Sequence, residues 1–159
     1  MPPPRILVYG YGNPGRADDG LGAAFVESMR EWAAENGQST ITFDTNYQLN
    51  IEDALLVSGH DIIIFVDAAE QADEFIYREI VPSNDITFST HAMAPESVLA
   101  LCEELYGKRP RAFLLTIRGS AWEAAGAMTE DAKRCLLAAE EHAKKIIIDP
   151  AALDDVLSN

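Results

Sequence analysis

Short apolar runs alternate with longer segments of helical periodicity along most of the chain. Residues 6–9 form an apolar run that ends at glycines, and residues 20–36 then carry apolar side chains every three or four positions. That spacing is typical of one face of a helix. The first part of the chain therefore predicts a strand, a loop and a helix.

The middle of the chain predicts three more strands and a short helix. Residues 41–43 form a second short strand, and residues 51–57 have the pattern of a short helix. The continuous apolar run at 62–66 is typical of a central strand that is buried on both faces. Residues 74–81 alternate less regularly and predict an edge strand, which Pro82 ends.

The last part of the chain predicts two helices around one strand. Pro95 suits the first turn of a helix, since its missing N–H is not needed there. Residues 112–117 form another apolar strand, and residues 129–145 predict a closing helix with Thr129 as its N-cap. Strands that alternate with helices in this order favour a mostly parallel sheet covered on both faces.

We therefore expect one α/β domain over residues 1–159, with three layers (α/β/α) and about five strands. The length of 159 residues suits a single domain. Ligand sites in such folds lie at the carboxyl ends of the strands.

The charge balance narrows the choice of partner. The chain has 26 acidic and 12 basic residues and a formal net charge of -14. An acidic surface repels the phosphates of nucleic acids and anionic membranes, so we expect neither as a partner. A cation or a basic peptide fits better, although most of these charges are expected to be solvated surface groups.

The two cysteines and the N-terminus favour a cytoplasmic protein. Cys102 and Cys135 fall in predicted helices, far from the spacing of a zinc site, and are expected to be buried thiols. The N-terminus lacks the apolar segment of a secretory signal, and no apolar run reaches the roughly 20 residues of a membrane span. We expect a monomer, because no long heptad pattern or exposed apolar strand indicates self-association.

Polar residues that follow the predicted strands suggest a metal-contacting site. Asp18 and Asp19 lie in the loop after the first strand, Asp67 ends the third strand, and His91 lies in a loop before a helix. Carboxylates and an imidazole suit a divalent transition metal such as zinc or nickel, with positions left open for water or substrate. We predict that Asp19, Asp67 and His91 contact a metal.

Each of these residues also has an ordinary structural explanation. Asp19 suits the positive end of a helix dipole, Asp67 suits the cap of a turn, and His91 suits a loop histidine bonded to a carbonyl. His60 precedes a strand, at the end opposite the proposed site, and His142 lies among charged residues of the last helix. We expect both of these histidines to be surface residues.

The first loop permits a rival interpretation as a dinucleotide-binding module. Gly10, Gly12 and Gly15 match G-x-G-x-x-G between a strand and a helix. However, two carboxylates occupy the helix start, where a pyrophosphate needs free amide donors. Asp44, which ends the second predicted strand, lies farther downstream than the usual ribose-binding acid.

Four phrases resemble the maturation endopeptidases of [NiFe] hydrogenases, in the same order and over most of the chain. The first, ILVYGYGNPGRADDGLG, resembles the opening strand, glycine turn and acidic pair of that family. IIIFVDAA resembles its third strand, which ends in Asp-Ala, and FSTHAMAPESVLAL resembles its histidine loop. YQLNIEDALLVSGHD resembles the stretch that joins its second and third strands.

The resemblance implies that Asp19, Asp67 and His91 are the metal-contacting positions, with Asp19 in place of the Glu of some relatives. Asp44 resembles a further acid near the family's site. The implied function is removal of a C-terminal extension from the hydrogenase large-subunit precursor after nickel insertion, with the nickel carried by the substrate as the recognition signal. Asp19 and Asp67 are then the catalytic acids, with roles left unassigned between them. The alternatives are a non-catalytic nickel-binding or chaperone-like protein with the same fold, and the dinucleotide-binding module.

Overall fold

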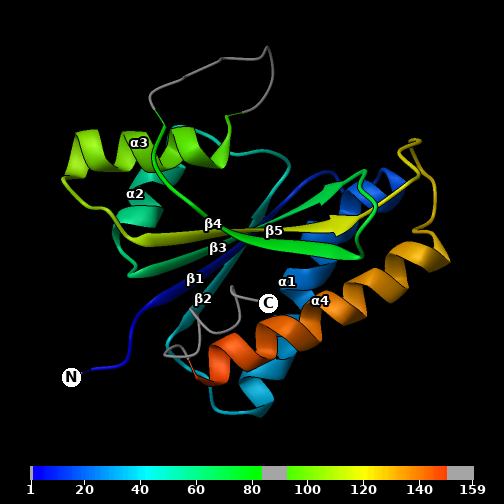
Figure 1. Cartoon of the computed structure of the whole chain (residues 1–159), viewed down its shortest axis with the longest axis horizontal. Helices are drawn as coiled ribbons and strands as arrows, with labels where there is room; N and C mark the ends of the chain where they lie inside the picture. The colour runs from blue at the N-terminus through cyan, green and yellow to red at the C-terminus, as the bar shows by residue number, and fades with distance from the viewer. Residues whose placement is uncertain (1, 84–92, 150–159) are drawn as a thin grey trace.

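The strands form one mostly parallel sheet, as predicted. The structure is a computed structural model that describes residues 2–83 and 93–149. The sheet has the order β2-β1-β3-β5-β4, in which β4 is the antiparallel edge (Figure 1). The strands are β1 (Ile6–Tyr11), β2 (Ile41–Asn46), β3 (Ile62–Ala69), β4 (Phe75–Ile80) and β5 (Arg111–Arg118).

Helices cover both faces of this sheet and complete the predicted three layers. A 3-10 turn, η1 (Ala17–Gly20), leads directly into α1 (Leu21–Glu35). α1 and α4 (Glu130–Ile148) lie on one face, whereas α2 (Asp53–Ser58) and α3 (Pro95–Tyr106) lie on the other (Figure 1).

The predicted starts of α3 and α4 are confirmed by their capping geometry. The Thr129 side chain accepts a hydrogen bond from the N–H of Ala132, which satisfies one donor at the start of α4. Pro95 is the first residue of α3, and Gly107 ends that helix in the left-handed conformation.

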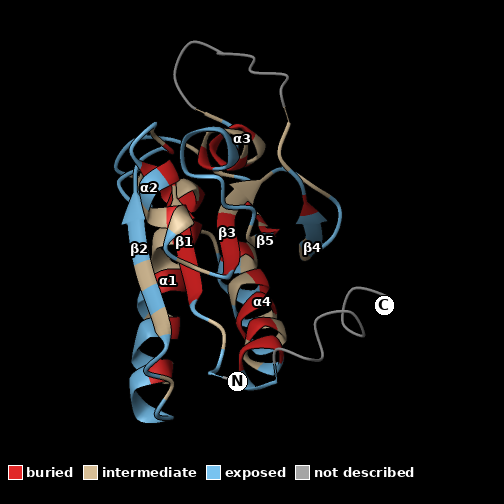
Figure 2. Cartoon of the chain, turned by 90° about the vertical axis from the view of Figure 1, so that its left-hand side faces the viewer, coloured by how far each residue is buried: buried red, intermediate tan, exposed pale blue. Residues whose placement is uncertain are grey.

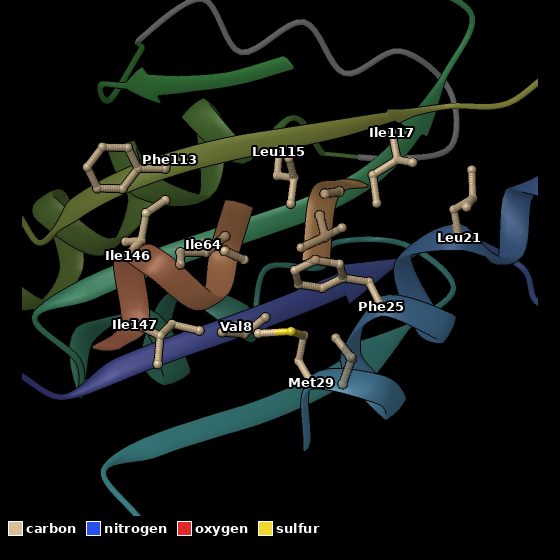
Figure 3. Close-up of a cluster of buried hydrophobic side chains, with 14 of the residues drawn as sticks. Val8, Leu21, Phe25, Met29, Ile64, Phe113, Leu115, Ile117, Ile146 and Ile147 are labelled. Atoms are coloured by element: carbon tan, nitrogen blue, oxygen red, sulfur yellow. The ribbon is translucent and has the colours of Figure 1, made fainter. Parts of the chain in front are cut away.

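Two apolar cores lie on opposite faces of the sheet. Val8 and Ile64 face α1 and α4, where they pack with Phe25, Met29 and other apolar side chains (Figure 3). Tyr9 and Phe65 belong to the core beneath α2 and α3. β1 and β3 are buried along most of their length, as expected for central strands (Figure 2). Cys102 and Cys135 are free and buried, as predicted.

Three strands extend two or three residues farther at their carboxyl ends than the apolar pattern predicts, and β5 is one residue longer at each end. β1 continues to Tyr11, β2 to Asn46 and β3 to Ala69. The prediction ended each strand at its first glycine or polar residue, but backbone pairing with the neighbouring strands continues past these positions. As a result, Asp67 lies inside β3 instead of ending it, and Asp44 lies inside β2.

The prediction that His142 is a surface residue is wrong. Its ring lies 5.0 Å from that of Phe75 and 5.2 Å from that of Tyr77, measured between centroids. Its Nε2 atom is buried and has no hydrogen-bond partner in residues 2–83 and 93–149. The charged residues next to His142 in the sequence do not reveal this burial, because the rings that contact His142 belong to β4, which is distant in the sequence.

Among the helices that the structure describes, none combines the length and the apolar character needed to cross a membrane.

Candidate active site at the carboxyl edge of the sheet

Asp67 is a partly buried carboxylate near the carboxyl end of β3. Its Oδ1 accepts a hydrogen bond from the N–H of Ala68 at 2.8 Å, and the Tyr11 side chain of the neighbouring strand lies close to the carboxylate. Burial raises the pKa of Asp67 to about 6, against the lowering effect of the Ala68 hydrogen bond and of the nearby Tyr11 hydroxyl. The negative charge of Asp19 also raises this pKa. Asp67 therefore holds a proton to higher pH than an ordinary aspartate.

Asp19 is held in the loop that follows β1. Its Oδ2 accepts a hydrogen bond from the N–H of Asn13 at 2.8 Å. Gly12 makes this loop possible, because its φ of +133° is rare for other residues and a Cβ there would lie 2.3 Å from the Asp19 carbonyl oxygen. The fold brings Asp19 near enough to Asp67 for their charges to interact, as the prediction of a shared site requires.

His91, the third predicted metal contact, lies outside the described residues. Within residues 2–83 and 93–149, no three His, Cys, Asp or Glu side chains are grouped in a way that suits a metal ion. The two carboxylates are thus the part of the predicted ligand set that the structure describes. Carboxylate oxygens suit a divalent transition metal only as part of a larger ligand set, with further ligands from elsewhere.

The register of the strands places polar residues of four neighbouring strands in a row at the carboxyl ends of the strands. The sequence pattern does not reveal this polar row. Tyr11 pairs with Asn46 of β2, and Asp67 pairs with Thr116 of β5. The pairing of β1 with β3 ends at Gly10 and Val66, so the next residues, Tyr11 and Asp67, lie on neighbouring strands at the same level. Paired residues of neighbouring parallel strands project to the same face, here the face covered by α2 and α3. The only sequence signal for this row is the two-residue alternation, which places Tyr11 on the same face as Tyr9.

Glu96 is an acid near this row that sequence reasoning missed. It lies in the first turn of α3, and its charge helps to raise the pKa of Tyr11, for which burial is the largest cause and Asp67 the next. The Oε1 atom of Glu96 is buried without a hydrogen-bond partner among the described residues. A second carboxylate therefore lies close to the Tyr11–Asp67 pair.

Asp18 has a structural role distinct from that of Asp19. It is fully buried, and its carboxylate accepts hydrogen bonds from the N–H groups of Ser120 at 2.8 Å, Ala121 at 3.1 Å and Thr129 at 2.8 Å. Burial alone would raise the pKa of Asp18, but these hydrogen bonds and that of the Thr129 hydroxyl outweigh it and hold the pKa below its usual value. Asp18 fastens the first loop to the segment before α4.

Asp44 lies one strand away from the Tyr11–Asp67 pair. It is exposed, and its register partner on β1 is Tyr9. The Tyr9 hydroxyl donates a hydrogen bond to Asp53 at 3.0 Å, and burial, together with the charges of Asp53 and Asp44, raises the pKa of Tyr9. Asp44 thus borders the candidate site without a described contact to Asp67.

The glycine loop does not offer the amide donors that a dinucleotide requires. The N–H groups of residues 12, 13 and 15–19 all donate hydrogen bonds within the protein. The acceptors include the Asp19 carboxylate and the Asn13 side chain. Since a pyrophosphate is held by free N–H groups at such a turn, the geometry disfavours the dinucleotide-binding interpretation.

His60 lies at the other end of the sheet, as predicted. One ring nitrogen contacts the Leu56 carbonyl at 2.8 Å, and the other contacts the Thr42 hydroxyl at 3.0 Å. Both ring nitrogens are therefore engaged in structural contacts away from Asp67.

Comparison with known proteins gives matches at the level of structure. No protein-family model matches the sequence, and no curated protein matches it. The [NiFe] hydrogenase maturation protease HycI from Thermococcus kodakarensis KOD1 superposes with a TM-score of 0.67 at 20% identity, over 98% of this chain and 93% of that one. The hydrogenase maturating endopeptidase HybD from E. coli gives a TM-score of 0.69 at 17% identity, over 92% and 93%.

A third match, HybD from Thermococcus kodakarensis, has a TM-score of 0.61 at 19% identity and covers 90% of this chain and 99% of that one. These matches extend over nearly the whole length of both partners, so they concern the complete architecture and not one motif. The resemblance recognised in the sequence is therefore confirmed at the level of the fold: the chain has the fold of the [NiFe] hydrogenase maturation proteases.

Proposed function

We propose that this chain is a peptidase that removes the C-terminal extension from the precursor of a [NiFe] hydrogenase large subunit after nickel has been inserted. The observation that carries the proposal is that Asp19 lies near enough to Asp67 for their charges to interact, at the carboxyl ends of the strands in a sheet with this fold. The ordered sequence phrases and the acidic surface, which suits a cationic centre, add support.

Asp67 is the better placed of the two acids to act on water. A general base works best when its pKa lies near the working pH, and the pKa of Asp67 is raised to about 6. In the proposed reaction, Asp67 takes a proton from the attacking water. Nickel carried by the substrate polarises the scissile carbonyl, which is the usual role of a Lewis-acidic metal.

Asp19 then contributes a contact to the substrate's nickel. Its Oδ2 is anchored by Asn13, so the carboxylate has a fixed orientation near Asp67. His91 completes the proposed contacts, in the neutral form in which an imidazole binds a metal. A precursor that lacks nickel would leave these two neighbouring negative charges without the cation that offsets their repulsion. The site therefore favours the loaded precursor.

The test is to incubate the purified protein with a large-subunit precursor prepared with and without nickel, and to measure loss of the tail by intact mass. We expect cleavage of the nickel-loaded form alone. Asp19→Asn, Asp67→Asn and His91→Ala should each reduce cleavage, whereas Asp73→Asn, at an exposed acid on a loop, serves as the control. Full activity in any two of the three site variants would refute the site assignment.

The same experiment separates the proposal from a non-catalytic role. A nickel-binding or chaperone-like protein with this fold would bind the loaded precursor and leave its mass unchanged. Binding of a correctly loaded precursor without any cleavage would favour that alternative.

A further inference from the structure

A cavity of about 470 Å³ lies at the amino ends of three central strands, at the edge of the sheet opposite Asp67. Four of the chain's 12 Lys and Arg residues are in the described lining of this cavity, against one of its 26 acids. The cations are Arg5, Lys108, Arg109 and Arg111, and the acid is Asp61. The cavity is therefore a local exception in a chain whose formal net charge is -14.

Backbone hydrogen bonds fix the segments that carry these charges. The N–H of Asp61 donates to the Arg5 carbonyl at 2.8 Å, and the N–H of Arg111 donates to the Asp61 carbonyl at 3.1 Å. β3 lies between β1 and β5 (Figure 1), so Arg5 and residues 108–111 flank Asp61 on opposite sides. Since neighbouring strands are about 5 Å apart, the two groups of cations are separated by roughly 10 Å at the backbone.

Three of the cations keep donors that a ligand can use. The Lys108 ammonium group has no ion-pair or hydrogen-bond partner within residues 2–83 and 93–149. The Arg5 side chain contacts Asp61 through Nε at 3.6 Å, and Arg109 contacts Glu103 through one nitrogen at 3.4 Å. Both Arg side chains are more than half exposed. Because a guanidinium has five N–H donors, one such contact leaves others available.

The nearby acids do not cancel the positive charge of the cavity. Glu79 and Glu103 each pair with one of its Arg side chains. Asp61 is engaged by Arg5, whose backbone N–H donates to its carboxylate at 2.8 Å. These three acids stand against four cations, so the local balance stays positive. An anion is therefore attracted here, although the rest of the chain repels it.

The arrangement suits a ligand with two linked phosphate groups. A phosphate carries more charge than a carboxylate, and an Arg side chain can bind two of its oxygens at once. One phosphate group reaches cations on one side of Asp61, whereas two linked groups can engage Arg5 on one side and Lys108 and Arg109 on the other. The volume of the cavity lies within the roughly 300–1,000 Å³ of small-molecule sites.

We propose that this cavity binds a small molecule that carries a diphosphate group. The inference goes beyond the proposed peptidase function and does not depend on it, because the cavity and the acids of the candidate active site lie at opposite edges of the sheet. The site also differs from the glycine loop, whose N–H groups are occupied within the protein.

The test is titration calorimetry of the full chain with sodium pyrophosphate, at constant ionic strength and without divalent metals. We expect one site, with a Kd that increases at least tenfold when Lys108→Gln and Arg109→Gln are combined. The control combines Lys133→Gln and Arg134→Gln, which remove the same charge from two exposed cations of α4 that pair with acids. This control should keep the wild-type Kd.

Two further probes define the class of ligand. Citrate has a similar charge carried by carboxylates and should bind at least tenfold more weakly than pyrophosphate. Equal binding of citrate would overturn the preference for phosphate. A glutamate-rich peptide that binds more tightly than pyrophosphate would make the cavity a docking site for an acidic protein segment and would overturn the small-molecule ligand.

Amide chemical shifts locate the bound anion. Pyrophosphate should shift the signals of residues 59–61 and 107–111. Shifts confined to residues 12–19 would place the anion at the glycine loop and overturn the proposal. An absence of binding, or an equal loss of binding in both double variants, would overturn it as well, and none of these results bears on cleavage of the precursor.

Discussion

Asp18 and Thr129 lie 111 positions apart in the chain and are joined by two hydrogen bonds. The Thr129 N–H donates to Oδ1 of Asp18 at 2.8 Å, and the Thr129 hydroxyl donates to Oδ2 at 2.9 Å. Thr129 is also the N-cap of α4. One buried carboxylate therefore fastens the loop that carries Asp19 to the start of the last helix.

Asp18→Asn should destabilise the protein by about 2–4 kcal/mol, because the amide replaces a charged acceptor of several hydrogen bonds and places an N–H₂ group among their donors. Chemical denaturation measures this loss, and Asp73→Asn, at an exposed acid, should leave the stability nearly unchanged. The pH dependence gives a second check. The pKa of Asp18 is lower in the folded state, so the stability it contributes is complete above about pH 4 and is lost as the pH falls through the folded-state value. A variant as stable as the wild-type protein at pH 7 would contradict this role.

Asp67→Asn should abolish cleavage and at the same time stabilise the protein. The folded state raises the pKa of Asp67 to about 6, so the folded protein keeps a proton that the unfolded chain releases near pH 4. Stability therefore falls as the pH rises from about 4 to 6, and it stays reduced above that range. At pH 7.5 the Asn variant, which carries no charge, should be more stable by roughly 1–3 kcal/mol.

Thermal denaturation at pH 7.5 and pH 4 tests this expectation for Asp67. The difference between the variant and the wild-type protein should shrink at the lower pH. A variant that is less stable than the wild-type protein at pH 7.5 would show that the charged Asp67 carboxylate does not destabilise the folded protein.

Gly12→Ala should disturb the Asp19 loop. The new Cβ would lie 2.3 Å from the Asp19 carbonyl oxygen, and the backbone φ of +133° is unfavourable for alanine. We expect a loss of about 2 kcal/mol or more in stability and a marked loss of cleavage.

Gly37→Ala is the matched control for Gly12→Ala. Gly37 also has a positive φ, of +68°, but its Cβ would meet no atom within 4 Å. This control should lose a smaller amount of stability, on the order of 1 kcal/mol, and keep full cleavage. Equal activity of the two variants would indicate that the position of Asp19 does not depend on Gly12.

His142→Phe should make the stability of the protein less sensitive to pH. Burial, with the charge of Lys145 as a smaller cause, lowers the pKa of His142 in the folded state. This histidine therefore binds a proton more readily in the unfolded chain than in the folded protein. The stability that His142 contributes is complete above about pH 6.5 and decreases as the pH falls below that value. Phenylalanine removes the group that binds the proton. It also removes the buried Nε2 atom, which has no hydrogen-bond partner among the described residues.

Urea denaturation between pH 7.5 and pH 5 measures this effect, with His60→Gln as the control at a histidine whose ring contacts are made at the other end of the sheet. The wild-type protein and the His60→Gln variant should lose stability over this range more steeply than His142→Phe does. Parallel pH profiles for wild type and His142→Phe would contradict the prediction.

The sequence alone determined the order and type of the elements, since hydrophobic periodicity reports which residues face a core. It also selected Asp19 and Asp67, because an acid that follows an apolar run in an α/β pattern falls at the carboxyl edge of the sheet. The ordered phrases predicted the fold that the structural matches confirm. His91 remains a prediction from the sequence, since it lies outside the described residues.

Only the tertiary structure decided which neighbours these acids have. Register placed Tyr11 beside Asp67, and the packing of α3 brought Glu96 close to the pair. Long-range hydrogen bonds separated the structural role of Asp18 from that of Asp19. The physical reason is that hydrophobic periodicity specifies the face on which a residue lies, whereas hydrogen bonds and pKa shifts depend on which distant segments pack against that face.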